Sequence, residues 1–254
     1  MRPNRVRECW ARNEAAVSAW LALGSGYGAE VVGMSGVDCV TVDLQHGMID
    51  AGALPGLLQA ISATPAAPFV RVPAIESGII MKALDSGSYG VIGPLVDSAA
   101  DAEALVRAST YPPRGRRSFG PARGLLYGGP DYPAEADGCL VRLAMIETRE
   151  GLGAVEAICA VPGLDGIFIG PNDLGLALGK GTALDPTDRE VRDAIDHCLR
   201  VARAAGLHAG IFCPSGTVAA RRAAEGFDFV VPNNDANLLR HALATELAGL
   251  RSEI

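Results

Sequence analysis

Lysine is almost absent from this chain. Of the 22 basic residues among 254, only Lys82 and Lys180 are lysines, and the rest are arginines. An enzyme that forms a Schiff base with a carbonyl substrate needs a lysine that projects from a strand into an apolar pocket, where desolvation lowers its pKa. Lys82 lies in a helical pattern and Lys180 in a glycine-flanked loop. The sequence therefore argues against this covalent chemistry.

Other features are also missing. The six cysteines include no CxxC pair, and several lie in apolar runs, which predicts buried free thiols in a reducing compartment. The N-terminus MRPNRVRECWARNEAA lacks the apolar stretch of a signal peptide, and no later run is long and uncharged enough to cross a bilayer. We therefore expect a cytoplasmic protein.

The chain has no excess of positive charge. Its net charge is −7 and its pI is about 5.1. Nucleic acids and acidic membranes select basic surfaces, so both are disfavoured as partners, and small molecules are favoured. With 49% hydrophobic residues, a chain of this length can bury one sizeable core. We expect residues 1–254 to form a single domain.

Short apolar runs alternate with helical patterns along the chain. Eight such units are typical of repeated βα elements around a parallel sheet, and continuously apolar runs suit strands buried on both faces. The sequence predicts an α/β fold, a (β/α)₈ TIM barrel, whose bottom is closed by a helix before residue 17. The predicted strands are 17–23, 39–44, 69–72, 90–96, 140–146, 166–169, 208–212 and 229–231, and the predicted helices are 51–62, 98–109, 152–160, 188–205, 217–225 and 236–250.

Residues 110–133 interrupt this spacing with a long stretch rich in proline, glycine and arginine. Loops of this length in compact domains are usually functional or mobile. The basic side chains of the stretch can bind phosphate or a distal carboxylate, but a solvated loop or a subunit contact explains them equally well. We assign no catalytic role to these arginines, which are Arg114, Arg116, Arg117 and Arg123.

Polar side chains gather where neighbouring predicted strands end, the position of the chemistry in TIM barrels. Glu147 ends the fifth strand and Asp173 follows the sixth, so both carboxylates can face one spot. Such a pair suits a hard cation such as Mg²⁺ or Mn²⁺, or serves as a general acid and base as in glycosidases. Arg71 on the third strand, suited to bind an anionic substrate, favours the metal.

His46 follows Asp43 and Gln45 at the end of the second predicted strand. This position favours partial exposure and proton transfer near neutral pH. One such residue is as often a structural cap or ion pair as a functional group, but four on adjacent strands favour a site. Asn172 or Asp173 can likewise cap a helix, while free N–H groups at that turn can hold a substrate carboxylate.

These residues lie in motifs that resemble the HpcH/HpaI aldolases, a family of metal-dependent pyruvate aldolases with a phosphoenolpyruvate/pyruvate-type barrel. The resemblance covers nearly the whole chain, with separate motifs in the family's order. They are VDLQHG (42–47), RVP (71–73), MKALDSGSYGVIGPLV (81–96), RASTYPPRGRRSFG (107–120), MIETREG (145–151) and GLDGIFIGPNDL (163–174).

The resemblance implies a class II aldolase, a carbon–carbon lyase that reversibly cleaves a 4-hydroxy-2-oxo acid to pyruvate and an aldehyde through a metal-stabilised pyruvate enolate. It implies Glu147 and Asp173 as ligands of Mg²⁺, Mn²⁺ or Co²⁺, and Arg71 as the contact of the oxo group. It also implies a homo-oligomer, a hexamer built as a trimer of dimers with exchanged C-terminal helices.

By the same resemblance His46 is the acid/base residue, paired with Asp85. Asp85 precedes the fourth predicted strand, so either a long connection brings it to the barrel mouth or it reaches the histidine of a neighbouring subunit. Backbone groups at Gly170 and Asn172 would receive the pyruvate carboxylate.

Two positions depart from the family pattern. Gln45 stands where the family often has glutamate, and Met145 stands, next to the substrate, where it often has glutamine. Neither departure touches a metal ligand, so both bear on the acceptor aldehyde rather than on pyruvate.

Two rival functions remain. An acyl-CoA lyase of the citrate lyase beta type needs cationic groups for the CoA phosphates, which only residues 114–123 offer. A non-catalytic barrel that binds an oxo acid has no reason to keep Arg71, Glu147, Asp173 and His46 together.

Overall fold

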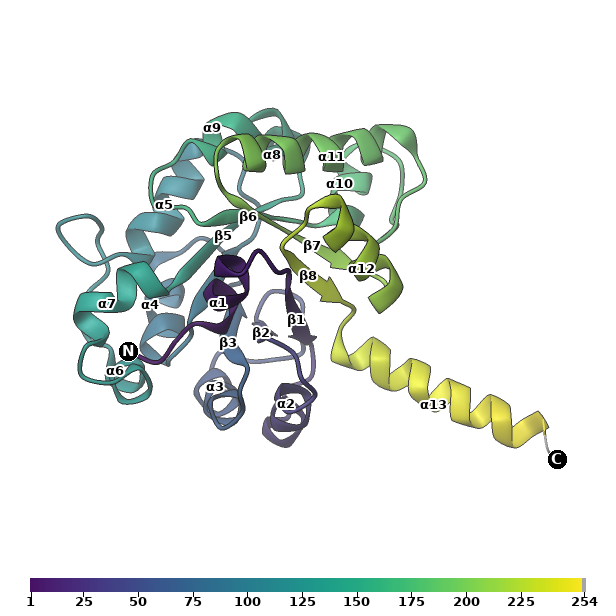
Figure 1. The fold of residues 1–254 in the computed structure, drawn as a ribbon, viewed down its shortest axis with the longest axis horizontal. Helices are drawn as coiled ribbons and strands as arrows, with labels where there is room; N and C mark the ends of the chain where they lie inside the picture. Colours follow the sequence, from purple (N-terminus) through teal and green to yellow (C-terminus); the bar gives the residue numbers. More distant parts are fainter. Residues whose placement is uncertain (253–254) are drawn as a thin grey trace.

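The computed structural model describes residues 1–252 as a barrel of eight parallel strands around which the helices are arranged (Figure 1). Each strand pairs with the next in chain order, and β8 pairs with β1 to close the barrel. The predicted fold and all eight predicted strands are confirmed. The strands are β1 (Ala16–Leu21), β2 (Cys39–Asp43), β3 (Ala67–Arg71), β4 (Gly90–Gly93), β5 (Val141–Ile146), β6 (Gly166–Ile169), β7 (His208–Cys213) and β8 (Phe229–Pro232).

β4 ends earlier than predicted because Pro94 has no N–H to offer a neighbouring strand and Leu95 adopts a left-handed conformation with φ of 51°. The predicted helix 152–160 is divided in two at Ala154. The helices are α1 (Arg5–Ala11), α2 (Gly26–Gly33), α3 (Leu54–Ser62), α4 (Ser77–Asp85), α5 (Ala99–Ser109), α6 (Ala122–Gly128), α7 (Tyr132–Cys139), α8 (Arg149–Gly153), α9 (Val155–Cys159), α10 (Pro171–Ala177), α11 (Arg189–Ala204), α12 (Gly216–Glu225) and α13 (Asp235–Ser252).

Aromatic side chains fill the barrel interior. The rings of Phe69 and Phe168 lie 5.8 and 6.1 Å from that of Phe229, and these contacts join strands that are not neighbours, so they cross the barrel. A Cβ on Gly90 would lie 2.3 Å from the Phe69 ring, and one on Gly210 would lie 2.7 Å from the Phe168 ring. Glycine at these two positions therefore leaves the space that the phenylalanines occupy.

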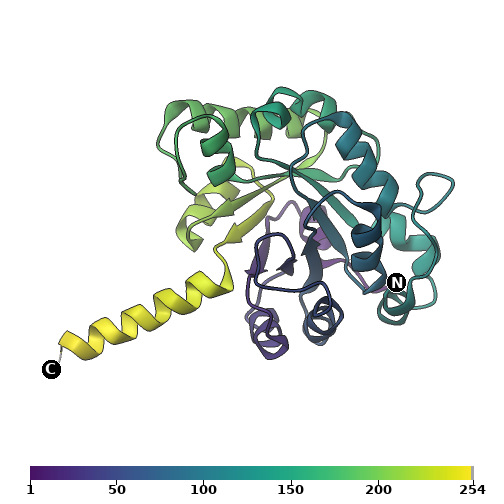
Figure 2. The same ribbon diagram turned by 180° about the vertical axis from the view of Figure 1, so that it is seen from behind.

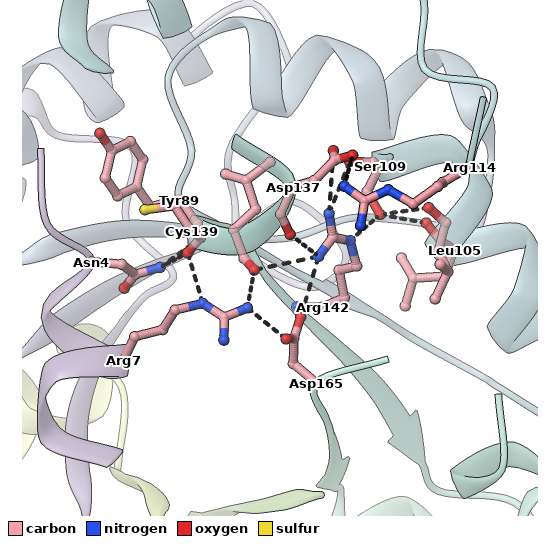
Figure 3. A network of polar contacts seen from close by, with 12 residues as sticks. Asn4, Arg7, Tyr89, Leu105, Ser109, Arg114, Asp137, Cys139, Arg142 and Asp165 are labelled. Carbon is pink, nitrogen blue, oxygen red and sulfur yellow. Dashed lines mark hydrogen bonds and ion pairs between the residues drawn. The ribbon is translucent and has the colours of Figure 1, made fainter. Parts of the chain in front are cut away.

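A polar network closes the N-terminal end of the barrel (Figure 3). Arg142 at the start of β5 donates to Ser109 Oγ at 3.0 Å and to the carbonyl of Asp137 at 3.1 Å. Asp165, ahead of β6, accepts from the backbone of Arg142 at 2.8 Å and from Arg7 of α1. The expected closure of the bottom by an N-terminal helix is confirmed.

The C-terminal helix α13 extends away from the barrel in both views (Figures 1 and 2). Its start is fixed by Asp235, whose carboxylate accepts from the N–H groups of Ala22 and Leu23 at 2.7 and 3.2 Å. None of its residues is buried. Its exposed leucines are Leu238, Leu239, Leu243, Leu247 and Leu250.

The cysteines are all free thiols, and five of the six are buried. Burial raises the pKa of both Cys198 and Cys213 to about 12, so both are protonated at neutral pH. The prediction of buried free thiols is confirmed, with Cys139 only partly buried. Within residues 1–252, every helix is too short or too polar to cross a membrane.

Candidate active site at the barrel mouth

A pocket of about 230 Å³ lies over the C-terminal ends of the strands. The turns after β2, β6 and β8 contribute to its wall, as the barrel fold predicts. Six of the predicted site residues line it, namely His46, Arg71, Met145, Gly170, Asn172 and Asp173. The other lining residues are Trp20, Ala22, Asp43, Phe168, Pro171, Leu184, Phe212, Asn234 and Asn237.

Arg71 is held at the end of β3 by Asp43 at the end of β2. Its Nε donates to Oδ1 at 2.9 Å and its Nη2 to Oδ2 at 2.6 Å. Trp20 adds a hydrogen bond to Oδ2 at 3.1 Å, and its ring lies 4.9 Å beneath the guanidinium. Burial alone would raise the pKa of Asp43, but the hydrogen bonds and charge of Arg71 hold that pKa below its ordinary value. The third nitrogen of Arg71, Nη1, faces Met145 Sδ at 3.8 Å.

Glu147 lies buried just beyond β5, with 3% of its surface exposed. Its Oε1 accepts from the N–H of Leu95 at 2.8 Å. Burial raises the pKa of Glu147, the Leu95 N–H opposes this, and the nearby charge of Asp173 adds to the rise. The end of β6 lies against the same carboxylate, because a Cβ on Gly170 would be 3.1 Å from Oε2. The structure therefore brings the two predicted carboxylates close together.

These two carboxylates fit a divalent cation. Glu147 is a buried acid whose carboxylate is disfavoured by desolvation and by Asp173, and a cation between the two groups would offset both effects. Within residues 1–252 no group of three or more histidine, cysteine, aspartate or glutamate side chains is placed to hold a metal ion. Magnesium sites commonly use one or two carboxylates and keep other positions for water and substrate.

His46 lies exposed at the rim of the pocket, in a tight turn after β2. Asp43 Oδ1 accepts from the backbone N–H groups of Gln45 and His46 at 3.0 and 3.2 Å, so this carboxylate orders the turn as well as Arg71. Gly47 is required next, since a Cβ there would lie 2.3 Å from the carbonyl oxygen of Asp43. The side-chain oxygen of Gln45 is buried and meets no donor within residues 1–252.

The α10 turn begins at Gly170 and Pro171. No side chain caps this helix, so the alternative in which Asn172 or Asp173 serves as its cap is wrong. The Gly170 carbonyl accepts from the N–H of Leu174 at 3.0 Å, which starts the helix directly at the pocket.

Asp85 lies outside the pocket. It ends α4, and its Oδ1 accepts from Arg117 Nη2 at 2.8 Å. No long connection brings Asp85 to the barrel mouth, because the residue lies at the end of α4, shortly before β4 begins. The expected pairing with His46 within one chain is therefore wrong. A pairing between subunits stays a prediction.

The segment 110–133 is not one irregular loop, because it contains α6 and the start of α7. Arg117 is fully buried against Tyr111, with its Cζ 4.5 Å from the ring centre. Arg123 donates to the Ser86 carbonyl at 2.8 Å, and Arg114 pairs with Asp137 at 2.9 Å. The arginines that a CoA lyase would use are thus largely engaged in contacts within the chain. The alternative that these arginines lie in a solvated loop is wrong for Arg117, which is buried.

Sequence reasoning missed several residues of this site. Trp20 and Phe212 lie in apolar strands, where nothing distinguishes a lining residue from a core residue. Leu95 contributes only its backbone N–H, which donates to Glu147. Apart from the preceding proline, nothing in the sequence indicates this contact. Asn234 lies two residues beyond β8 and Asn237 lies in the first turn of α13, so their position after an apolar strand is a signal that could have identified them.

Comparisons with known proteins agree with this geometry. The family model described as HpcH/HpaI aldolase/citrate lyase matches residues 17–242. The chain is 44% identical to a hydroxypyruvate/pyruvate aldolase of Rhizorhabdus wittichii over 98% of this chain and 99% of the relative. It is 36% identical to a 5-keto-4-deoxy-D-glucarate aldolase of Klebsiella pneumoniae, covering 94% of each. The crystal structure of an HpcH/HpaI aldolase/citrate lyase family protein from Burkholderia cenocepacia matches with a TM-score of 0.90 and 29% identity, over 98% and 99% of the two chains.

Proposed function

Because the chain belongs to the HpcH/HpaI aldolase/citrate lyase family and is a carbon–carbon lyase, we propose that it is a divalent-metal-dependent pyruvate aldolase. Its substrate is a 4-hydroxy-2-oxo acid, cleaved reversibly to pyruvate and an aldehyde. The observation that carries this proposal is the closeness of buried Glu147 to Asp173 and to the end of β6, at a pocket that Arg71 and Asp173 line. The relatives named hydroxypyruvate/pyruvate aldolase and 5-keto-4-deoxy-D-glucarate aldolase support the same substrate class.

Glu147 and Asp173 would hold the cation, which when bound supplies electrophilic polarisation of the 2-oxo group. Arg71 presents Nη1 toward the pocket, fixed in direction by Asp43, and stabilises the charge that develops on the C2 oxygen as the C3–C4 bond breaks. The turn from Gly170 to Asn172 receives the substrate carboxylate through its backbone.

His46 is the proton acceptor in the cleavage direction. At the pocket rim it can take the C4 hydroxyl proton as the aldehyde forms, and return that proton in the addition direction. The donor ketone is pyruvate, and the name of the Rhizorhabdus relative supports hydroxypyruvate as a second donor.

The proposal is tested by chelation. Pyruvate release from a 4-hydroxy-2-oxo acid, followed with lactate dehydrogenase and NADH, should stop after EDTA treatment and removal of the chelator. It should return on addition of Mg²⁺, Mn²⁺ or Co²⁺. Full activity in the chelated protein, with metal content checked by mass spectrometry, would remove the metal from the proposal.

We further propose that the functional unit is a homo-oligomer in which α13 packs on a second copy of the chain. The exposed leucines of α13 form an apolar strip without a partner in residues 1–252 of one chain. Tyr27, Val31 and Met34 on and after α2 are also exposed and supply a matching apolar surface. Light scattering of the full chain should report an oligomer, with a hexamer expected, and deletion of residues 236–254 should lower the mass.

We also propose that the whole chain acts as one barrel domain. Free thiols persist in a reducing compartment, so they favour a cytoplasmic location.

A further inference from the structure

The connection between α10 and α11, residues 178–188, is fixed to three helices. On α10, a Cβ on Gly175 would lie 2.5 Å from the carbonyl oxygen of Gly181, so the connection packs directly on the helix. At α11, Lys180 Nζ lies 3.0 Å from Glu190 Oε2, and Asp188 caps the helix by accepting from the Glu190 N–H at 2.9 Å. These contacts give a connection without regular structure a defined path.

The third attachment is to α12. Arg221 Nη2 lies 2.5 Å from Asp185 Oδ1, and Arg222 Nη2 lies 3.8 Å from the same oxygen. Arg222 is almost fully buried and is itself held by Glu225 at 2.8 Å, so its position is fixed. The next residue, Pro186, is buried as well. Asp185 and Pro186 together hold the connection against α12.

Leu184 directly precedes this attachment and is the one residue of the connection that lines the pocket. The groups assigned to pyruvate, Arg71 and Glu147 among them, come from β3, β5 and the end of β6. Leu184 lines the same pocket as Arg71 and Asp173, and among the lining residues it has no part in the groups assigned to pyruvate. As an apolar side chain on the pocket wall, it is available to contact the aldehyde half of the substrate.

We propose that Leu184 sets the size of the acceptor aldehyde and that the ion pair between Asp185 and Arg221 keeps Leu184 in place. The proposal rests on the aldolase function proposed above. An apolar wall discriminates by volume, because a larger group clashes with it and a smaller one loses contact. Replacing Leu184 with alanine removes three carbons and would enlarge the pocket at this position. Breaking the ion pair of Asp185 would let Leu184 move away from the pocket.

The first test compares two uncharged acceptors, glycolaldehyde and the bulkier isobutyraldehyde, in aldol addition to pyruvate. For each variant we take the ratio of kcat/KM for isobutyraldehyde to that for glycolaldehyde, which cancels any loss of active enzyme. Leu184→Ala should raise this ratio about tenfold. The matched control is Leu176→Ala, since Leu176 is an exposed leucine of α10 that does not line the pocket. It should keep the wild-type ratio.

The second test concerns the ion pair. Arg221→Ala should raise the ratio in the same direction and Arg221→Lys should restore it, whereas a residue that only stabilises the fold would leave the ratio unchanged. The double variant Arg221→Ala with Leu184→Ala should have nearly the same ratio as Leu184→Ala alone, because both substitutions change the same part of the pocket. Arg12→Ala is the control, as Arg12 and Arg221 have side chains 54% and 51% exposed and each pairs with a carboxylate.

A donor-only readout separates failure of this inference from failure of the function. Exchange of the pyruvate methyl protons in D₂O, followed by proton NMR, requires enolisation but no aldehyde. Absence of metal-dependent exchange in the wild type overturns the aldolase proposal itself. Exchange with an unchanged acceptor ratio in Leu184→Ala overturns the role of Leu184, and an unchanged ratio in Arg221→Ala overturns that of the ion pair.

Discussion

Asp43 and Arg71 stand opposite each other in the register of β2 and β3, and one carboxylate takes two of the guanidinium nitrogens. Both side chains are nearly buried, at 4% and 8% exposure. The pair therefore orients Nη1 of Arg71 toward the pocket before any substrate arrives. Such preorganised donors need no rearrangement when charge develops in the transition state.

Replacing Arg71 with lysine should lower kcat about 10²–10³-fold with the fold intact, because lysine keeps the charge but lacks the planar fork. Steady-state pyruvate release and circular dichroism measure the two effects. Arg149→Lys is the control, since Arg149 is an exposed arginine near the mouth that donates to the Ala177 carbonyl. A kcat within twofold of wild type would remove Arg71 from the mechanism.

Asp43→Asn should change the response of stability to acid. Arg71 holds the pKa of Asp43 below its ordinary value, so the carboxylate stabilises the fold above about pH 3.9, and this contribution is lost as the pH falls through the lower folded pKa. At neutral pH the variant should lose about 3–5 kcal/mol, as a buried pair is broken. Urea unfolding between pH 3 and 7 should show the two curves converging in acid. Parallel curves would contradict the assignment.

Glu147→Gln should stabilise the metal-free protein while abolishing activity. Burial and Asp173 raise the pKa of Glu147, so the fold loses stability as the pH rises from the unfolded pKa to the folded pKa, and the loss persists above that. Glutamine is neutral and keeps an oxygen for the Leu95 N–H. At pH 7.5 the variant's Tm without metal should exceed the wild-type value.

Added Mn²⁺ should then raise the Tm of the wild type and not that of Glu147→Gln, since a cation held by the proposed ligands would bind only the folded chain. Glu150→Gln, at an exposed glutamate three residues further along, should behave like the wild type. Equal shifts in all three proteins would place the metal elsewhere.

His46→Ala should reduce cleavage about 10²–10⁴-fold without loss of structure, since this residue at the pocket rim is the proposed proton acceptor. His197→Ala is the comparison, because His197 lies on α11 beside Glu156 and outside the pocket. Wild-type cleavage by His46→Ala would transfer the proton step to another group.

Asp85 offers a test of the oligomer. If it serves His46 of a neighbouring subunit, then His46→Ala and Asp85→Ala should each be inactive alone. Subunits of the two variants, mixed and reassembled, should regain part of the activity, because some sites then combine two intact residues. No recovery in a mixed oligomer verified by mass spectrometry would leave Asp85 with its role beside Arg117.

The sequence predicted the strands well because parallel strands buried on both faces are continuous apolar runs, as in Gly166–Ile169. It also predicted that His46, Arg71 and Asp173 gather at the ends of the strands, and all three line one pocket, because polar groups at the ends of apolar strands have few structural reasons to be there. It did not find Trp20 or Leu184, whose apolar side chains look the same on a core wall and on a pocket wall. Nor did it foresee α6, because glycine and proline around a seven-residue helix hide its periodicity.

The network around Arg142 lies at the start of β5, at the end of the barrel opposite the pocket. The groups that seal the barrel and the groups that line the pocket therefore lie at opposite ends of the strands. Randomised libraries directed at the residues around Leu184 and Asn234 would leave that seal untouched. A large fraction of such clones should still fold, which makes this scaffold well suited to laboratory evolution toward new carbon–carbon bonds.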